Sequence, residues 1–327
     1  MRKLSLLVGG CAVLLLGVAV HSQTPAARQQ QRGGDPGPGP VTVSGRSPSP
    51  AAVKRFKIDA HYHFRDNPEF VKQTVDVHRK FNTMVVALTA YEAIEHTKEY
   101  VKQYPDVIIP FGGIRLDDPD VLNKIDQYHA AGFKGVGEVS GPYHDYDSSE
   151  YWPVYAKLAE SNMAILFHTG IVARGRPEVP QTSGMMRMRP GFLDTIARRF
   201  PKLNIIGAHF GNPWYDEAAE AARWNPNLVW DISGSSLIKR DANPESWKQI
   251  LWWVPDLSTR HSPPSAGHAF HKMVFATDEG PEGLETNIER FERFLTANNV
   301  PADVAEQCWQ STIAKMLGVT PRTTATQ

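Results

Sequence analysis

Eight short runs of apolar, β-forming residues alternate with longer amphipathic stretches between Phe56 and Gly280. A strand followed by a helix is the repeating unit of a parallel sheet, because parallel neighbours need a crossover connection. Eight such units over roughly 260 residues match a closed (β/α)8 barrel in length and order. The expected strands are FKIDAH (56–61), TMVVAL (83–88), VIIPFGGI (107–114), GVGEVS (135–140), AILFHTG (164–170), NIIGAHFG (204–211), LVWDISG (228–234) and MVFATDEG (273–280).

The stretches between these runs carry helix signals. Residues 119–132 open with a proline and close with a glycine, and their apolar residues recur at helical spacing. Residues 151–162 and 191–201 behave similarly, and Pro201 stops the second of them. The sequence therefore predicts a single α/β domain with the (β/α)8 TIM-barrel fold. A doubly wound open sheet is the alternative, but it does not normally gather polar residues from the ends of many strands.

Polar residues follow most of the predicted strands at the point where each strand ends. Active sites of barrels of this kind lie at the carboxyl ends of the strands. A polar side chain that follows an apolar run is costly to bury unless it is paired or binds a metal. The residues at these ends are His61, His63, Glu138, His168, His209 and Asp278.

The two histidines of IDAHYHF are separated by one residue. Strand side chains alternate, so His61 and His63 point to one side, about 7 Å apart along the backbone, while Tyr62 points away. Taken alone, this pair also fits two solvated or core histidines, and a lone His168 or His209 fits a structural histidine. Four histidines and an aspartate at strand ends of one barrel favour a shared metal site. Imidazole and carboxylate ligands suit zinc or another divalent first-row ion that keeps a position open for water.

Four longer stretches resemble the amidohydrolase superfamily, specifically the amidohydrolase-related group that includes aminocarboxymuconate-semialdehyde decarboxylase. They are IDAHYHF, ILFHTG, VFATDEGPEG and the segment from Ala197 to Gly234, and the similarity covers about residues 56–318. The resemblance implies that His61, His63, His168 and Asp278 are the metal ligands. It also implies that His209 transfers protons beside the metal-bound water, a role that Asp278 shares.

One residue departs from the pattern of the two-metal relatives. Their fourth strand carries a carboxylated lysine, whereas GVGEVS offers Glu138. A glutamate at this position could bridge a second ion, bind the first ion or orient a histidine ligand. We expect one divalent ion, zinc, with a second ion as the alternative; in that case His168 and His209 would move to the second ion.

The motifs are specific for the group but not for one reaction within it. Our leading hypothesis is an exported hydrolase that uses a metal-activated water on a small carboxylate, amide or lactone-like substrate. The first alternative is a metal-dependent, non-oxidative decarboxylase of an unsaturated or aromatic carboxylic acid, because the same ligand set serves both reactions. A barrel that binds a metal or ligand without turnover is the second alternative.

The segment after the fifth predicted strand, IVARGRPEVPQTSGMMRMRPG, is rich in arginine and methionine. Arginines near the pocket favour an anionic substrate, because a guanidinium pairs with a carboxylate through two hydrogen bonds. A solvated basic loop is the alternative. The candidate substrate-binding residues are Arg174, Arg176, Arg187 and Arg189, together with Arg115 beyond the third strand.

The N-terminus has the features of an export signal. Arg2 and Lys3 precede an apolar stretch that ends in small residues, which suggests cleavage after residue 22. The Pro-, Gly-, Gln- and Ser-rich residues 23–52 predict a disordered linker. The catalytic domain is expected at residues 53–320 and a tail at 321–327. We therefore expect a periplasmic or extracellular protein with no stable membrane span after signal removal.

Composition restricts the partners. Basic and acidic residues are equal in number, 35 each, and no long run of one sign occurs. A nucleic-acid partner is therefore not expected, and the absence of glycine-rich phosphate motifs gives no indication of a nucleotide cofactor. A small-molecule substrate is expected. The three tryptophans of residues 245–257 fit a homo-oligomer interface or a lid, and core packing equally well.

Overall fold

The computed structural model describes residues 46–172, 184–234, 237, 242–252 and 267–320. Within these ranges, eight strands form one sheet in which each strand pairs in parallel with the next one along the chain. The predicted barrel is confirmed, and the open doubly wound alternative is wrong. The strands are β1 (Lys57–His63), β2 (Thr83–Thr89), β3 (Ile108–Gly112), β4 (Gly135–Val139), β5 (Ala164–Phe167), β6 (Ile205–Gly207), β7 (Leu228–Asp231) and β8 (Met273–Val274).

The first and last strands meet through backbone hydrogen bonds. The amide of Ala60 donates to the carbonyl of Phe275 over 2.9 Å, and the amide of Asp278 donates to the carbonyl of His61 over 2.8 Å. Tyr62 and Glu279 add an isolated parallel bridge. These contacts bring the ends of β1 and β8 together, so the side chains that follow both strands reach the same mouth of the barrel.

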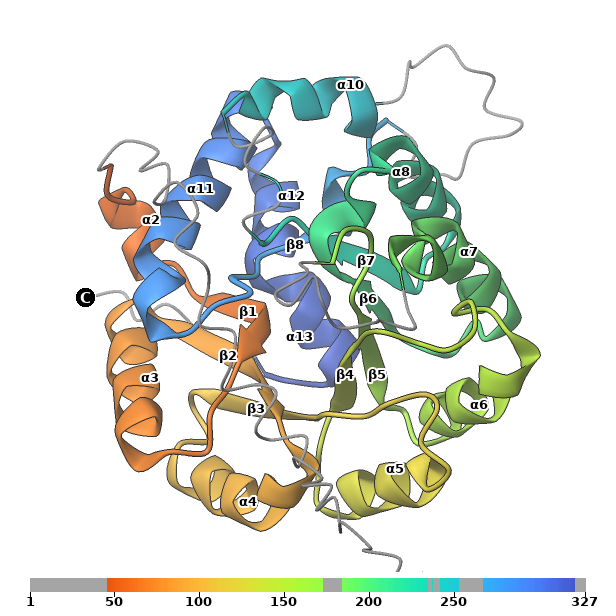
Figure 1. Cartoon of the computed structure of the whole chain (residues 1–327). Coiled ribbons are helices and arrows are strands. Elements are labelled where there is room, and N and C mark those ends of the chain that lie inside the picture. Colours follow the sequence, from red (N-terminus) through yellow and green to blue (C-terminus); the bar gives the residue numbers. More distant parts are fainter. Residues whose placement is uncertain (1–45, 173–183, 235–236, 238–241, 253–266, 321–327) are drawn as a thin grey trace, which may run out of the picture. The chain divides into compact units, whose positions relative to one another are not determined.

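Helices surround the strands (Figure 1). α3 shows how the sequence starts one: the side chain of Asn67 accepts hydrogen bonds from the amides of Glu69 and Phe70, and Pro68 occupies the first turn. The longer helices are α3 (Pro68–Lys80), α4 (Ile94–Gln103), α5 (Val121–Ala130), α6 (Trp152–Glu160), α7 (Pro190–Arg199), α8 (Tyr215–Trp224) and α11 (Leu284–Ala297). The shorter ones are α2 (Pro50–Lys54), α10 (Lys248–Leu251), α12 (Ala302–Glu306) and α13 (Thr312–Leu317).

Single turns and other short helices connect these elements. They are η1 (Tyr91–Ala93), η2 (Ser149–Tyr151), η3 (Met185–Met188), η4 (Ala208–Gly211), η6 (Pro244–Trp247), η8 (Phe270–Lys272), η9 (Pro281–Gly283) and the π-helical η10 (Gln307–Ser311). In the part of the chain that the structure describes, no helix has both the length and the apolar character needed to cross a bilayer.

The apolar core lies on both faces of the strands. One cluster joins alternating strand residues such as Ile58, Val86 and Leu166 to Ile313 of α13. A second, larger cluster joins residues of the opposite strand faces to the surrounding helices, as Trp230 illustrates. Strands covered on both faces read as continuous apolar runs, which is why these runs predict a parallel sheet.

Candidate metal centre

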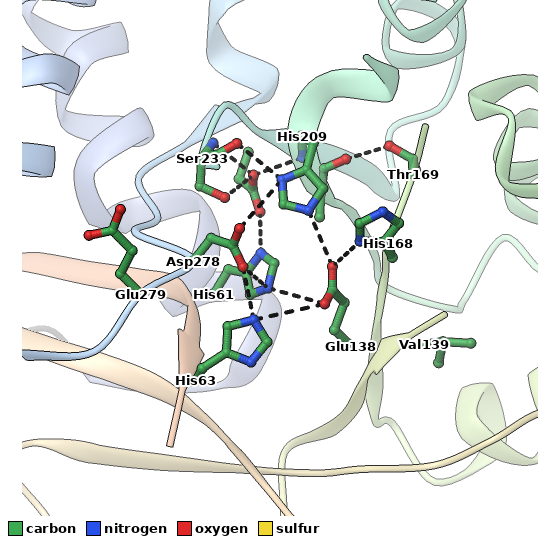
Figure 2. Close-up of polar contacts among 12 residues, drawn as sticks. His61, His63, Glu138, Val139, His168, Thr169, His209, Ser233, Asp278 and Glu279 are labelled. Atoms are coloured by element: carbon green, nitrogen blue, oxygen red, sulfur yellow. Dashed lines mark hydrogen bonds and ion pairs between the residues drawn. The ribbon is translucent and has the colours of Figure 1, made fainter. Parts of the chain in front are cut away.

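Six polar side chains converge at the carboxyl ends of five strands (Figure 2). They form two groups, and within each group the potential ligand atoms lie within 4.8 Å of one another. The groups share Glu138, which belongs to β4 and lies between them. The first group is His61, His63, Glu138 and Asp278, and the second is Glu138, His168 and His209.

The first group is centred on one oxygen of Asp278. Its Oδ1 lies 2.8 Å from His63 Nε2 and 3.2 Å from His61 Nε2. Oε2 of Glu138 lies 3.7 Å from His61 Nε2 and 3.9 Å from His63 Nε2. Both histidines of β1 therefore face the same point, as the strand alternation predicts. Tyr62 points the other way and its hydroxyl contacts Thr74 of α3.

The second group is centred on the other oxygen of Glu138. Its Oε1 lies 2.7 Å from His168 Nδ1 and 3.3 Å from His209 Nε2. The two imidazole rings meet edge to face with centroids 4.7 Å apart. One carboxylate thus presents one oxygen to each group of nitrogen ligands.

The remaining nitrogen of three histidines faces a fixed acceptor. His61 Nδ1 lies 3.1 Å from Asp231 Oδ2, His168 Nε2 lies 3.1 Å from the carbonyl of Ile171, and His209 Nδ1 lies 3.0 Å from the carbonyl of Ser233. A carbonyl or ionised carboxylate only accepts, so the nitrogen that faces it carries the hydrogen. In the neutral imidazole, the lone pair of the other nitrogen then points at the central carboxylates.

A lone pair directed at a carboxylate oxygen is repulsive unless a proton or a metal ion lies between the two atoms. His61 supports this interpretation: its Nε2 is fully buried and has no hydrogen-bond partner among the described residues. Histidine nitrogens fixed by a second partner and directed at carboxylates are a typical ligand arrangement for a divalent first-row metal ion. The residues present therefore fit the metal that the sequence predicts.

The charges of the centre shift its pKa values strongly. Burial lowers the pKa of His61, but the carboxylates of Asp278 and Glu138 outweigh it and raise this pKa well above its usual value. Burial also opposes the charged form of His209, and the bond to Glu138 still raises its pKa to about 9. Burial likewise favours neutral carboxyls, yet the neighbouring histidines hold the pKa of Glu138 and Asp278 below the usual values. Without a metal, protons on the imidazoles balance the buried carboxylates.

Unusual backbone conformations place two of the donors. His209 and Phe210 have φ values of +61° and +43°, and Asp278 has a φ of +59°. Non-glycine residues in this left-handed region are strained and cluster at functional sites. The amide of His209 donates to Asp231 Oδ1 over 3.0 Å, which helps to hold this turn.

The sequence model of the amidohydrolase family matches residues 49–278, a span that ends at the last donor of the centre. The chain belongs to the amidohydrolase family. The resemblance seen in the sequence motifs is therefore confirmed. No curated protein matches this amidohydrolase.

Solved structures with the same fold include proteins of several descriptions. An uncharacterized TIM-barrel protein from Bordetella bronchiseptica is 16% identical, covers 81% of this chain and 99% of its own, and has a TM-score of 0.55. A probable 2-pyrone-4,6-dicarboxylic acid hydrolase from Acinetobacter baumannii is 12% identical over 81% and 100%, with a TM-score of 0.51. A 5-carboxyvanillate decarboxylase from Novosphingobium aromaticivorans, solved with manganese, is 11% identical over 84% and 100%, with a TM-score of 0.54. At these identities the likeness concerns the fold alone.

The grouping of the donors differs from the sequence prediction. His61, His63, His168 and Asp278 were expected to surround one ion, but His168 lies in the second group with His209. Glu138, whose role the sequence left open, belongs to both groups. His168 and His209 are the residues expected on a second ion if one binds, and the number of ions stays a prediction.

Asp231 is a residue of the centre that the sequence analysis missed. It ends β7, is fully buried and contacts both His61 and the backbone of His209. Burial opposes ionisation, but the bond to His61 keeps the pKa of Asp231 below its usual value. The same signal that identified the other donors, a polar residue at the end of an apolar run, also marks this position in LVWDISG.

The candidate substrate arginines have different surroundings. Arg189 is paired with Glu217 and stacks on Trp214, so its charge is already matched. Arg187 is half-buried and donates a hydrogen bond of 3.4 Å to the carbonyl of Pro142, which follows β4. Arg115 is exposed and lies beside Tyr143. Arg174 and Arg176 lie outside the described residues.

Proposed function

We propose that this amidohydrolase is a metal-dependent hydrolase of a small carboxylate, amide or lactone-like substrate. The observation that supports it best is the position of Glu138, with one oxygen at 2.7 Å from His168 and the other facing His61 and His63. A carboxylate shared by two groups of nitrogen donors suits a centre with two ions. Two adjacent ions are a typical arrangement for metal-assisted hydrolysis.

In this proposal, His61, His63 and Asp278 would hold one ion, His168 and His209 would hold the other, and Glu138 lies within reach of both groups. Nitrogen and oxygen ligands suit zinc. Divalent ions held there would lower the pKa of a water molecule and polarise the substrate carbonyl. The one-ion arrangement that we expected from the sequence accounts for His61, His63 and Asp278 but not for the separate group of His168 and His209.

Proton transfer then belongs to Asp278 rather than to His209. Both nitrogens of His209 are engaged, Nδ1 with the carbonyl of Ser233 and Nε2 with Glu138. Asp278 contacts the β1 histidines through Oδ1, whereas its Oδ2 lies 4.0 Å from Nδ1 of His209. Oδ2 can accept the proton of the attacking water and return it to the leaving nitrogen or oxygen as the bond from the carbonyl carbon breaks.

Arg187 supports an anionic substrate. Its guanidinium reaches from the segment after β5 to the segment after β4, the two strands that carry His168 and Glu138. The backbone amide of Gly170, two residues from His168, donates to the carbonyl of Met188, the neighbour of Arg187. A half-buried cation at this place can bind a substrate carboxylate through two hydrogen bonds.

Export to the periplasm or the exterior is part of the proposal and depends on the N-terminal sequence alone. Residues 1–45, which carry the predicted signal and most of the predicted linker, lie outside the described residues.

The test combines metal analysis with a substrate panel. The purified chain, loaded with zinc, is expected to hold two ions, and Glu138→Gln is expected to hold fewer.

The panel contains N-acyl amino acids, lactones, esters and aromatic carboxylic acids. A hydrolase releases an acid together with an amine or alcohol, and Asp278→Asn should lower kcat by roughly 100-fold or more. Carbon dioxide as the product would instead identify the rival decarboxylase, and no turnover on any class would favour a barrel that only binds.

A further inference from the structure

Among the residues that the structure describes, Asp231 is the one buried carboxylate that contacts both groups of the centre without belonging to either. It ends β7 and is 0% exposed. Its Oδ2 faces His61 Nδ1 at 3.1 Å, on the side of the first group. Its Oδ1 accepts three hydrogen bonds, from the amide of His209 at 3.0 Å, the amide of Ser233 at 3.0 Å and the hydroxyl of Ser233 at 2.7 Å.

These bonds determine the orientation of two imidazoles in different ways. The contact with Oδ2 keeps a hydrogen on Nδ1 of His61, which leaves the lone pair of Nε2 directed at Asp278 and Glu138. The contact with Oδ1 holds the amide of His209 in its left-handed turn, where φ is +61°. Asp231 also fixes Ser233, whose carbonyl accepts the Nδ1 hydrogen of His209.

The geometry points to Asp231 as a positioning residue that sets the tautomer of His61 in the first group and the backbone turn of His209 in the second. This inference rests on the metal centre proposed above and goes beyond it, because it explains what turns the metal-facing nitrogen of each imidazole toward the carboxylates.

The role requires a carboxylate rather than an amide. Four donors surround Asp231, one at Oδ2 and three at Oδ1. An asparagine has a single oxygen, and three donors hold that oxygen at the position of Oδ1. Its NH2 group then faces His61 Nδ1, which must turn into an acceptor. The hydrogen of the neutral ring moves to Nε2, the atom that should bind the metal.

The Asp231→Asn variant should therefore affect metal binding at the first group and not at the second. We expect its affinity for one zinc ion to fall by about 10- to 100-fold, as is typical when the partner of a metal-binding histidine is changed. The second ion should bind as in the wild type, because the amide oxygen still holds His209 and Ser233. Asp231→Ala lacks both acceptors and should weaken both ions. The measurement is calorimetric titration of the metal-free chain with zinc chloride.

A matched control is available in Asp59. It is also fully buried and accepts three donors, the amide of His61 and the amide and hydroxyl of Thr277, but it contacts no imidazole nitrogen. We expect both Asp59→Asn and Asp231→Asn to lose unfolding stability, but Asp59→Asn should show no selective loss of one ion. Nitrogen-15 NMR of labelled histidine in the metal-free chain at high pH reads the tautomer directly, with hydrogen on Nδ1 of His61 in the wild type and on Nε2 in Asp231→Asn.

The outcomes separate this inference from the proposed function. A wild-type chain that binds no zinc contradicts the metal centre itself. A wild-type chain that binds two ions, with Asp231→Asn binding both equally well, contradicts only the role of Asp231. An equal loss of both ions in Asp231→Asn and Asp59→Asn would show a general structural effect and would also overturn it.

Discussion

Gly234 follows β7 in a position where any side chain would press on the metal centre. A Cβ atom built there lies 2.8 Å from His209 Nδ1 and 3.2 Å from Asp278 Oδ2, and the φ of Gly234 is +93°. Both donor groups would have to move to accept a methyl group. We expect Gly234→Ala to weaken zinc binding by roughly tenfold or more, measured by calorimetric titration.

Gly132 provides the control for backbone strain. Its φ is +82°, but a Cβ atom there meets nothing within 4 Å. Gly132→Ala should therefore cost roughly 1 kcal/mol of unfolding free energy or more through its backbone alone, with zinc affinity unchanged. Equal zinc affinities for the two variants would mean that contact with the donors has no effect.

The identities of the donors were predictable, but their grouping was not. Each donor follows an apolar run, and that pattern is visible along the sequence. Whether His168 approaches His63 or His209 depends on the strand twist and on the left-handed turn at His209, for which a non-glycine residue carries no clear sequence signal. Asp231 was predictable by the same rule as the others and was missed because the resemblance assigned it no role.

At the scale of elements, the strands after β4 end earlier than their apolar runs. The run 204–211 contains only β6 (Ile205–Gly207), and the run 273–280 contains only β8 (Met273–Val274). In both, the chain leaves the sheet to place a donor, His209 or Asp278, with positive φ. An apolar sequence shows that residues are buried, not that they belong to a strand. The turns after β6 and β8 are buried too, so the apolar runs continue through them and predict strands that are too long.

Helix α2 is attached to the opposite end of β1 by the buried amino group of Lys57. Nζ of Lys57, the first residue of β1, donates to the carbonyls of Ala52 and Arg55 at 2.7 Å each. These carbonyls lie at the C-terminal end of α2, where the last carbonyls of a helix have no partner within it. Burial lowers the pKa of Lys57 to about 7, so hydrogen bonding to these carbonyls, rather than a full charge, makes the attachment. We expect Lys57→Met to lower the unfolding free energy by about 2 kcal/mol, measured by urea denaturation.

Lys54 is the matched control for this prediction, because it lies in the same helix and is exposed. Lys54→Met should leave the urea midpoint close to that of the wild type. Zinc binding should be unchanged in both variants, since Lys57 and His63 occupy opposite ends of β1 and the barrel end without the site serves stability. A Lys57→Met chain as stable as the wild type would contradict the attachment.

For the whole molecule, the barrel was predictable because eight repeats of one pattern leave few other folds. The residue at which the domain begins was harder to predict. α2 begins at Pro50, three residues before the predicted start of the domain, and Ser49 caps it with its side chain. The five-residue helix is too short to show a clear period, and the proline-rich composition around it suggested a linker.

The charge balance of the centre predicts that metal ions and protons compete for the imidazoles of His61 and His209. This competition should affect the stability of the whole molecule. At pH 7 the metal-free chain holds protons on His61, whose pKa is raised well above 6.5, and on His209, whose pKa is about 9. Both Nε2 lone pairs must be free to bind an ion, so zinc should release about two protons at pH 7. Its apparent affinity should rise roughly tenfold per pH unit for each proton, and the contribution of His209 should end near pH 9.

Calorimetry in buffers of different ionisation enthalpy counts these protons, and unfolding gives a second, independent measurement. A raised pKa in the folded state means that the His209 contribution to stability is complete below pH 6.5 and is lost as the pH rises to about 9. The lowered pKa values of Glu138 and Asp278 act in the opposite direction, because their contributions are lost as the pH falls through the acidic range. In chelator, the melting temperature should therefore decline from pH 6.5 to 9, and saturating zinc should remove that decline. Zinc binding without proton release at pH 7 would mean that the imidazoles are already neutral and that the carboxylates are balanced by another charge.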